Sequence, residues 1–193
     1  MRLGPLTDMS PEQTELHDRI VARRGTVPGP FQVWLRSPRL GDLAEETGTY
    51  CLRESALPPR LRELCLLLAA RHFEAQHSWN AHVDKGVEAG IDRAALLRLA
   101  RGQEPEFTAE DERVLYRFAT EILDEHFVCD ETFAAARELL GERELVDVVG
   151  ALGTFSMFAM LLNTFEVDLQ PGCEPPFPGI EGYRRVGGRD GAV

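Results

Sequence analysis

Residues 58–90 read PPRLRELCLLLAARHFEAQHSWNAHVDKGVEAG, and this stretch decides the fold. Paired prolines suit the first turn of a helix, where a missing N–H group has no intrahelical partner to lose. The run Leu64–Ala70 is apolar on nearly every face of a helix that reaches about His72. After a break near residues 73–75, the pattern predicts a second helix that ends at Gly90. The stretch therefore predicts two consecutive helices, the first of them buried.

Helix signals of the same kind continue on both sides. Ser10-Pro11-Glu12-Gln13 supplies an N-cap, a proline at the first helical position and a glutamine at the third, and Gly25 is a suitable stop. Ser37-Pro38 repeats the start signal. Further helices are expected to begin at Asp92, Thr108, Asp130 and Glu142. Because no alternating apolar–polar run is bounded by turn residues, the predicted fold class is all-α, with many helices in one compact body.

A single domain is expected over residues 1–169, with its core at 38–168, because 193 residues suit one domain better than two. From Gln170 onward the composition changes, and ten of the last 24 residues are proline or glycine. Such a segment is typical of an extended arm or a disordered tail. Residues 170–193 are therefore expected to form a C-terminal arm that can reach a partner subunit.

Charge and cysteine content exclude several classes of function. A net charge of -11 argues against nucleic acid and against an anionic membrane surface as partners. Lys85 is the single lysine, and no phosphate-binding GxxxxGK[ST] loop is present. The four cysteines are scattered without a CxxC pair, and the first residues do not form a secretory signal. We expect a reduced, cytoplasmic protein.

The last predicted helix contains an uncharged stretch, Val148–Phe165, whose eighteen residues reach the lower limit for a membrane span. Two glycines and four polar side chains lower its hydrophobicity. A helix that is apolar all round is usually central in a soluble protein or covered by a neighbouring subunit. No membrane span is predicted, and the glycines would let another helix approach closely.

Three of the five histidines, His72, His77 and His82, lie within eleven residues. Helical metal ligands are spaced by three or four residues, whereas these are spaced by five, so no metal site is predicted. Glu63 precedes the apolar run, and a carboxylate held against apolar neighbours suits proton transfer near neutral pH. Alternatively, Glu63 pairs with an arginine or only favours the first turn of its helix.

Ser78 and His82 lie one helical turn apart, which places them within hydrogen-bonding range. A Ser–His hydrolase is disfavoured, because the nucleophile-elbow motif G-x-S-x-G is missing and the context is helical. A lone histidine on an apolar face is also often a satisfied structural residue.

The spacing of these residues resembles the carboxymuconolactone decarboxylase-like family, which includes the alkyl hydroperoxidase D proteins. The resemblance runs from about Leu3 to Pro171 and includes GPFQVWLRSPRL at residues 29–40 and GERELVDVVGALGTFSMFAMLLNTFEV at residues 141–167. It implies an all-helical alkyl hydroperoxidase D-like fold and an assembly of identical subunits as a trimer or hexamer. It also implies active sites close to subunit contacts, and no cofactor.

The peroxidases of this family carry the pattern E-x11-C-x-H-C-x3-H. On this sequence Glu63, His77 and His82 match the glutamate and both histidines, whereas Ala75 and Ser78 occupy the two cysteine positions. Thiol peroxidation needs a thiolate, which neither alanine nor serine supplies. A dithiol peroxidase is therefore disfavoured, and a residual peroxidase would need Cys51 or Cys65 in the pocket.

Members without these cysteines typically carry Tyr-Glu-Trp-x-x-His in the same place, and this sequence reads His77-Ser78-Trp79-Asn80-Ala81-His82. Trp79 and His82 match, whereas His77 and Ser78 depart from the pattern. The resemblance implies cofactor-free acid–base chemistry, such as decarboxylation, on a small organic acid or lactone. His82 would move the proton, Glu63 would orient His82 or share its proton, and His77 would be an optional second acid–base group. Ser78 and Trp79 would shape the substrate pocket.

The alternative to catalysis is a non-catalytic oligomer that binds a small ligand. The two hypotheses differ in a measurable way, because a binding protein is stabilised by its ligand without turning it over. The sequence leaves the substrate, the direction of the reaction and the number of subunits open.

Overall fold

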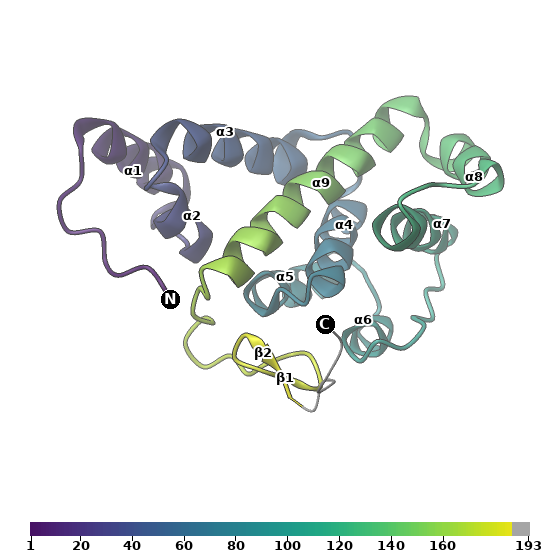
Figure 1. Cartoon of the computed structure of the whole chain (residues 1–193). Coiled ribbons are helices and arrows are strands. Elements are labelled where there is room, and N and C mark those ends of the chain that lie inside the picture. Colours follow the sequence, from purple (N-terminus) through teal and green to yellow (C-terminus); the bar gives the residue numbers. More distant parts are fainter. Residues whose placement is uncertain (187–193) are drawn as a thin grey trace.

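A computed structural model describes residues 1–186 of the chain, and within them the fold is almost entirely helical (Figure 1). The helices are α1 (Pro11–Arg24), α2 (Gly29–Trp34), α3 (Pro38–Thr49), α4 (Pro59–His72), α5 (Gln76–Glu88), α6 (Arg93–Ala100), α7 (Glu110–Thr120), α8 (Asp130–Leu140) and α9 (Glu142–Thr164). Two π-helical turns, η1 (Tyr50–Glu54) and η2 (Glu121–Glu125), extend α3 and α7. The prediction of an all-α fold is confirmed.

Local signals in the sequence explain most helix ends. Ser10 accepts a hydrogen bond from the Gln13 backbone while the Gln13 side chain accepts one from Ser10, and Gly25 ends α1 with a left-handed φ of 77°. Asp92 caps α6 as expected. Thr108 was expected to cap α7, but the N-cap is the next residue, Ala109, which makes no side-chain cap, and the helix begins at Glu110.

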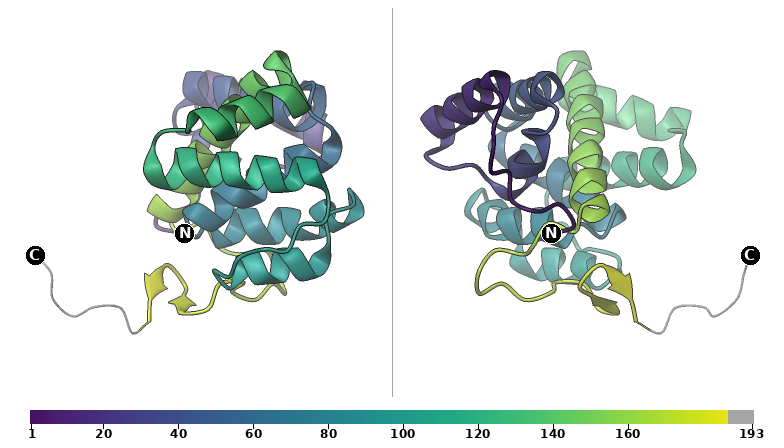
Figure 2. Two further views of the ribbon diagram at one scale, coloured as in Figure 1. Left: turned by 90° about the vertical axis from the view of Figure 1, so that its right-hand side faces the viewer. Right: turned by 60° about the vertical axis from the view of Figure 1, so that its left-hand side comes forward.

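Helix α9 runs diagonally through the molecule, and the other helices lie on both sides of it (Figure 1). It packs against α4, α8, α2, α3 and α5. One hydrophobic cluster joins α4 to α8 with the first two-thirds of α9, and a second joins α1 to α3 with its last residues, Leu161 and Leu162. Figure 2 shows the two groups of helices on either side of α9.

Helix α9 is long and apolar enough to cross a membrane by length and composition alone. However, 61% of its most apolar window is buried within the fold, as for the central helix of a globular protein. One polar residue of α9, Asp147, also ties it to η1 and to the loop that follows η1. The Asp147 carboxylate accepts hydrogen bonds from the Tyr50 hydroxyl at 2.9 Å and from the Ala56 backbone at 2.8 Å. This contact fixes the loop that follows η1.

Helices α4 and α5 form the antiparallel pair that positions the candidate site. Leu64 to Ala70 are all buried, as the apolar run predicted. The chain reverses at Glu74, whose left-handed φ of 52° ends α4, and the Asn163 side chain donates to the Phe73 carbonyl at 2.6 Å. These contacts set the register in which α5 returns along α4.

Beyond α9 the chain turns back and follows α5. It ends in a short antiparallel hairpin of two strands, β1 (Ile180–Glu181) and β2 (Arg184–Arg185). Two-residue strands are too short to give an alternating pattern, which explains why the sequence did not predict them. Residues 170–186 are the described part of the predicted arm, and residues 187–193 lie outside it.

Candidate functional site

Glu63 and His82 meet across the α4–α5 pair. The Oε2 atom of Glu63 lies 2.8 Å from Nδ1 of His82, a hydrogen bond between residues nineteen positions apart in the chain. Their side chains are 16% and 15% exposed, so the pair is largely shielded but not sealed from solvent. The structure therefore brings together the two residues that the sequence placed at the centre of the site.

The hydrogen bond determines which ring nitrogen of His82 is available. A carboxylate can only accept, so Nδ1 carries the proton and Nε2 of a neutral ring presents its lone pair. Among the described residues, Nε2 has no hydrogen-bond partner. A carboxylate that fixes the tautomer of a histidine in this way prepares the other nitrogen for proton transfer.

Ser78 and Trp79 lie one turn before His82 on α5. Ser78 is half-buried, whereas Trp79 is only 3% exposed. The indole ring packs edge-on against Phe177, with ring centroids 5.3 Å apart. Phe177 comes from the segment beyond α9 and therefore covers Trp79 from the side of the C-terminal arm.

His77 contacts the segment that follows α9 and Gly29 at the start of α2. Its Nδ1 atom donates to the Asp168 carbonyl at 2.7 Å, and its ring packs so closely on Gly29 that an added Cβ there would lie 2.6 Å from Cε1. Burial lowers the pKa of His77 from its ordinary value of 6.5, although the Asp168 carbonyl opposes this shift. These contacts give His77 a structural role in joining α5 to the segment after α9.

The two cysteines considered for a residual peroxidase, Cys51 and Cys65, are 3% and 0% exposed. Burial raises the pKa of both thiols, most strongly that of Cys65. A thiol that is buried and stays protonated is a poor nucleophile. Cys129 and Cys173 are exposed, and all four cysteines are free.

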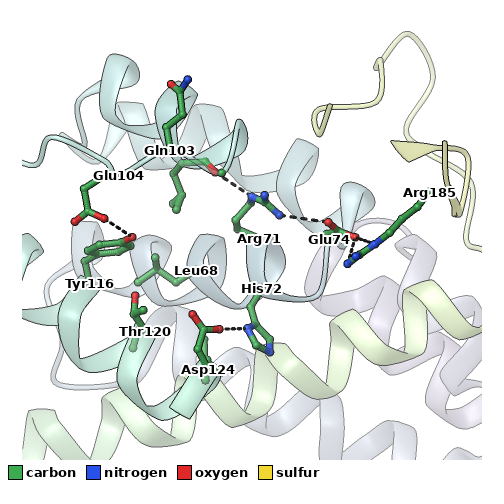
Figure 3. A pocket seen from close by; sticks show the side chains of 14 residues that line it. Leu68, Arg71, His72, Glu74, Gln103, Glu104, Tyr116, Thr120, Asp124 and Arg185 are labelled. Atoms are coloured by element: carbon green, nitrogen blue, oxygen red, sulfur yellow. Dashed lines mark hydrogen bonds and ion pairs between the residues drawn. The ribbon is translucent and has the colours of Figure 1, made fainter. Parts of the chain in front are cut away.

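A cavity of about 370 Å³ lies at the C-terminal end of α4, and Figure 3 shows its lining. It contains none of the predicted site residues. His72 pairs with Asp124 on one side at 2.8 Å, and Arg71 and Arg185 both approach Glu74 on another. His72 therefore lies in this cavity and not with His77 and His82. Within residues 1–186, no group of three or more His, Cys, Asp or Glu side chains could hold a metal ion.

Sequence reasoning missed the residues that surround the site from beyond α9. The Asp168 carbonyl acts through its backbone, for which a sequence carries no side-chain signal. Phe177 could have been singled out, because it is a large apolar side chain flanked by prolines in a segment rich in proline and glycine. It is 3% exposed and belongs to the main hydrophobic cluster.

Comparisons with known proteins identify the fold. No model of a protein family matches the sequence, and no curated protein sequence matches it. Among solved structures, the chain is similar to an uncharacterized peroxidase-related protein from Silicibacter sp. TM1040, with a TM-score of 0.71 and 14% identity over 89% of this chain and 91% of that one. It is also similar to an alkylhydroperoxidase AhpD core from Ralstonia eutropha JMP134, with a TM-score of 0.70 and 14% identity over 87% and 92% of the two chains.

A third similar structure is the debrominase Bmp8 in complex with 2,3,4-tribromopyrrole, with a TM-score of 0.68 and 12% identity over 86% of this chain and 90% of that one. At these identities the comparisons establish the arrangement of helices alone. The chain has the alkyl hydroperoxidase D-like fold.

Proposed function

We propose that this chain, an alkyl hydroperoxidase D-like fold without its cysteine pair, is a cofactor-free acid–base enzyme of the carboxymuconolactone decarboxylase-like type. Its substrate is a small organic acid or lactone. The observation that carries the proposal is the 2.8 Å hydrogen bond from His82 Nδ1 to Glu63, which leaves Nε2 free to exchange a proton. His82 is the proposed catalytic residue, and Glu63 is the residue that positions it.

Decarboxylation shows how this pair would act. The bond between the substrate carbon and its carboxylate breaks, CO₂ leaves, and the electron pair stays on the substrate as a delocalised enolate. Protonated His82 then gives its Nε2 proton to that carbon and regains a proton from water. The Glu63 carboxylate stabilises the imidazolium through Nδ1 during this cycle. No electron is transferred to an outside acceptor, so the step needs no thiol.

The surroundings of the pair support acid–base chemistry over thiol peroxidation. Ala75 and Ser78 occupy the two cysteine positions, and the nearby thiols of Cys51 and Cys65 are buried with raised pKa values. A peroxide would therefore find no thiolate at either position of the cysteine pair. The proposal places the protein in the cytoplasm, where free cysteines stay reduced.

We further propose that the functional unit is a homo-oligomer. Val146, Val149 and Phe133 are 71%, 51% and 48% exposed along a groove of about 640 Å³ between α8 and α9. Gly150, which also lines the groove, leaves open space where a side chain would stand. An apolar groove of this kind is typical of a protein–protein contact.

The test is to incubate the purified protein with a panel of lactones and β-keto acids and to record CO₂ release. His82→Gln should lower kcat by ~100-fold or more with little change in KM, since general acid–base catalysis contributes ~10²–10⁴. Glu63→Gln should lower kcat less, because the imidazole remains but loses its orienting partner. His17→Gln, on the surface of α1, is the matched control.

The outcomes of the CO₂ assay distinguish catalysis from binding. Release that disappears with His82→Gln supports the proposed roles, and wild-type turnover in that variant would contradict them. If no acid releases CO₂, solvent deuterium exchange into a ligand that raises the melting temperature separates other proton transfers from mere binding. Binding without exchange would favour the non-catalytic oligomer.

A further inference from the structure

Residues 170–186, called the strap below, run along helix α5 and are fastened to it by side-chain–backbone hydrogen bonds. Gln170 donates to the His77 carbonyl at 3.1 Å, Asn80 donates to the Glu174 carbonyl at 2.9 Å, and Gln76 donates to the Gly182 carbonyl. Three of these residues lie on consecutive turns of α5 just before His82. The strap therefore contacts the part of the helix that carries the candidate site.

Phe177 is the main buried anchor of the strap. Its ring is 3% exposed and lies between Trp79, 5.3 Å away between centroids, and the Arg71 guanidinium, whose Cζ is 5.2 Å from the ring centroid. Ile180, at 9% exposure, is the second apolar anchor. The residues Pro171, Gly172, Cys173, Glu174 and Pro175 are exposed. Of the seventeen residues of the strap, Phe177 and Ile180 are the buried ones.

The far end of the strap forms one wall of the cavity shown in Figure 3. Arg185 pairs with Glu74 at 2.9 Å, and its own side chain is 72% exposed, so solvent weakens this ion pair. Backbone hydrogen bonds within the strap are few, and they include those of the hairpin and one from Val186 to Gly179 at 2.8 Å. Besides Phe177 and Ile180, this wall is held by a few side-chain hydrogen bonds, from Gln76 to the Gly182 carbonyl and from Tyr183 to the Val167 carbonyl.

We propose that the strap is a releasable lid with Phe177 as its latch. It opens as one unit about the exposed turn at its own start, where Gly172 adopts a left-handed φ of 82°, while the helices stay folded. Opening uncovers Trp79 and removes the Arg185 wall of the cavity. Segments with few buried contacts open at a lower free energy than the core, which is the physical basis of the inference.

The consequence for the site rests on the proposed function. With the strap closed, the turns of α5 before His82 are held against the strap and against α4 at the same time. With the strap open, α4, α9 and the Asp168 carbonyl still hold them, but the hydrogen bonds that Gln76 and Asn80 donate to the strap are lost. The closed strap would thus regulate the Glu63–His82 site, because it covers and orders the turns of α5 that carry Gln76 and Asn80.

Hydrogen exchange on the full chain, followed by mass spectrometry, tests the lid without any assay of activity. In the wild type, amides of the hairpin should exchange through a local opening, at least about tenfold faster than those of α4 and α9. Phe177→Ala should accelerate hairpin exchange by a further factor of about ten or more, with α4 and α9 unchanged. Phe127→Ala removes a phenylalanine that is 80% exposed and is the matched control.

Two further measurements keep the test decisive. Arg185→Ala loosens the strap from an exposed position, so it should speed hairpin exchange in the same direction without touching the core. In a Trp34→Phe background, Trp79 is the single tryptophan, and its emission should shift to the red in the Phe177→Ala variant. The lid is contradicted if hairpin and α4 amides exchange at the same rate, or if Phe177→Ala accelerates both equally. It is also contradicted if neither Phe177→Ala nor Arg185→Ala changes hairpin exchange.

The proposed function and the lid fail in different ways. If the strap is not a lid, the amides of the hairpin and of α4 exchange at the same rate, even in a fully active enzyme. Loss of the proposed function would appear as the absence of turnover in a protein whose hairpin still opens locally.

Discussion

The imidazole of His77 donates through Nδ1 to the backbone carbonyl oxygen of Asp168 at 2.7 Å, which ties the first turn of α5 to the segment just after α9. His77, which departs from the pattern of the family members without cysteines, therefore has defined structural contacts. The ring is largely buried, and burial disfavours its charged form although the carbonyl favours it. The stability of the folded chain should therefore depend on the titration of His77.

The free energy of unfolding should decrease as the pH falls below about 6.5, because burial lowers the pKa of His77 in the folded protein. The unfolded chain then binds more protons than the folded one, so acid favours unfolding. His77→Asn keeps an N–H donor but cannot titrate, and it should lose this part of the pH dependence. Urea unfolding between pH 5 and pH 8 measures it. The assignment would be contradicted if the free energy of unfolding of His77→Asn fell with pH as steeply as that of the wild type. His17→Gln is the control and should keep the wild-type pH dependence.

Glu45 is a buried carboxylate that connects α3 to the end of α1. It is 3% exposed and accepts hydrogen bonds from Arg23, Arg24 and Thr49. Glu45→Gln should lower the free energy of unfolding by about 1–3 kcal/mol, the contribution of hydrogen bonds to a charged group. Glu46→Gln, the exposed neighbour, should change it by less than about 0.5 kcal/mol. Equal effects of the two substitutions in chemical denaturation would show that Glu45 contributes little.

Gly41 is required by close packing between α3 and α2. An added Cβ would lie 2.8 Å from the Trp34 carbonyl oxygen, which is backbone and cannot move aside. Although alanine favours a helix by up to ~1 kcal/mol over glycine, Gly41→Ala should be destabilising by about 1–3 kcal/mol net. At Gly86 the nearest atom is the side-chain Cδ1 of Leu67 at 2.9 Å, so Gly86→Ala should cost less. Thermal unfolding of both variants gives the order, and the reverse order would contradict this account.

The α8–α9 groove should be the contact between subunits. Val146→Glu places a charge where the side chain is 71% exposed, and burial of an unpaired charge at a contact is costly. The wild type should run above the 21.6 kDa of one chain in light scattering, and Val146→Glu should shift it toward one chain. Leu97→Glu, on α6 at 49% exposure, should leave the mass unchanged. A wild type that is monomeric at all concentrations would rule the contact out.

The sequence predicted the helical hairpin at α4 and α5 because the signals there are local. Prolines begin α4, and the apolar run from Leu64 marks a buried helix. The Glu63–His82 contact was anticipated through the family pattern, and the antiparallel return of α5 makes it physically possible. The pairing of Glu63 with an arginine, the other reading of that residue, is not what the structure shows.

Other features depended on contacts that no local pattern encodes. Glu74 takes a left-handed backbone conformation because its neighbours on α9 and in the chain reversal fix it there. The π-helical turn at Tyr50 is stabilised by Arg62, whose guanidinium donates to the Leu52, Ser55 and Leu57 carbonyls left without helical partners. Pairings of this kind between a side chain and distant backbone groups are visible only once the chain is folded.

Helix α9 contributes to both hydrophobic clusters, and this has a consequence for cooperativity. Its first part is shared with α4 to α8 and its last part with α1 to α3, so neither cluster can lose its packing without exposing part of the same helix. A chain with two separate cores can melt in two steps, whereas a common rigid element makes them melt together. Residues 11–164 should therefore unfold as one calorimetric unit, with equal van't Hoff and calorimetric enthalpies.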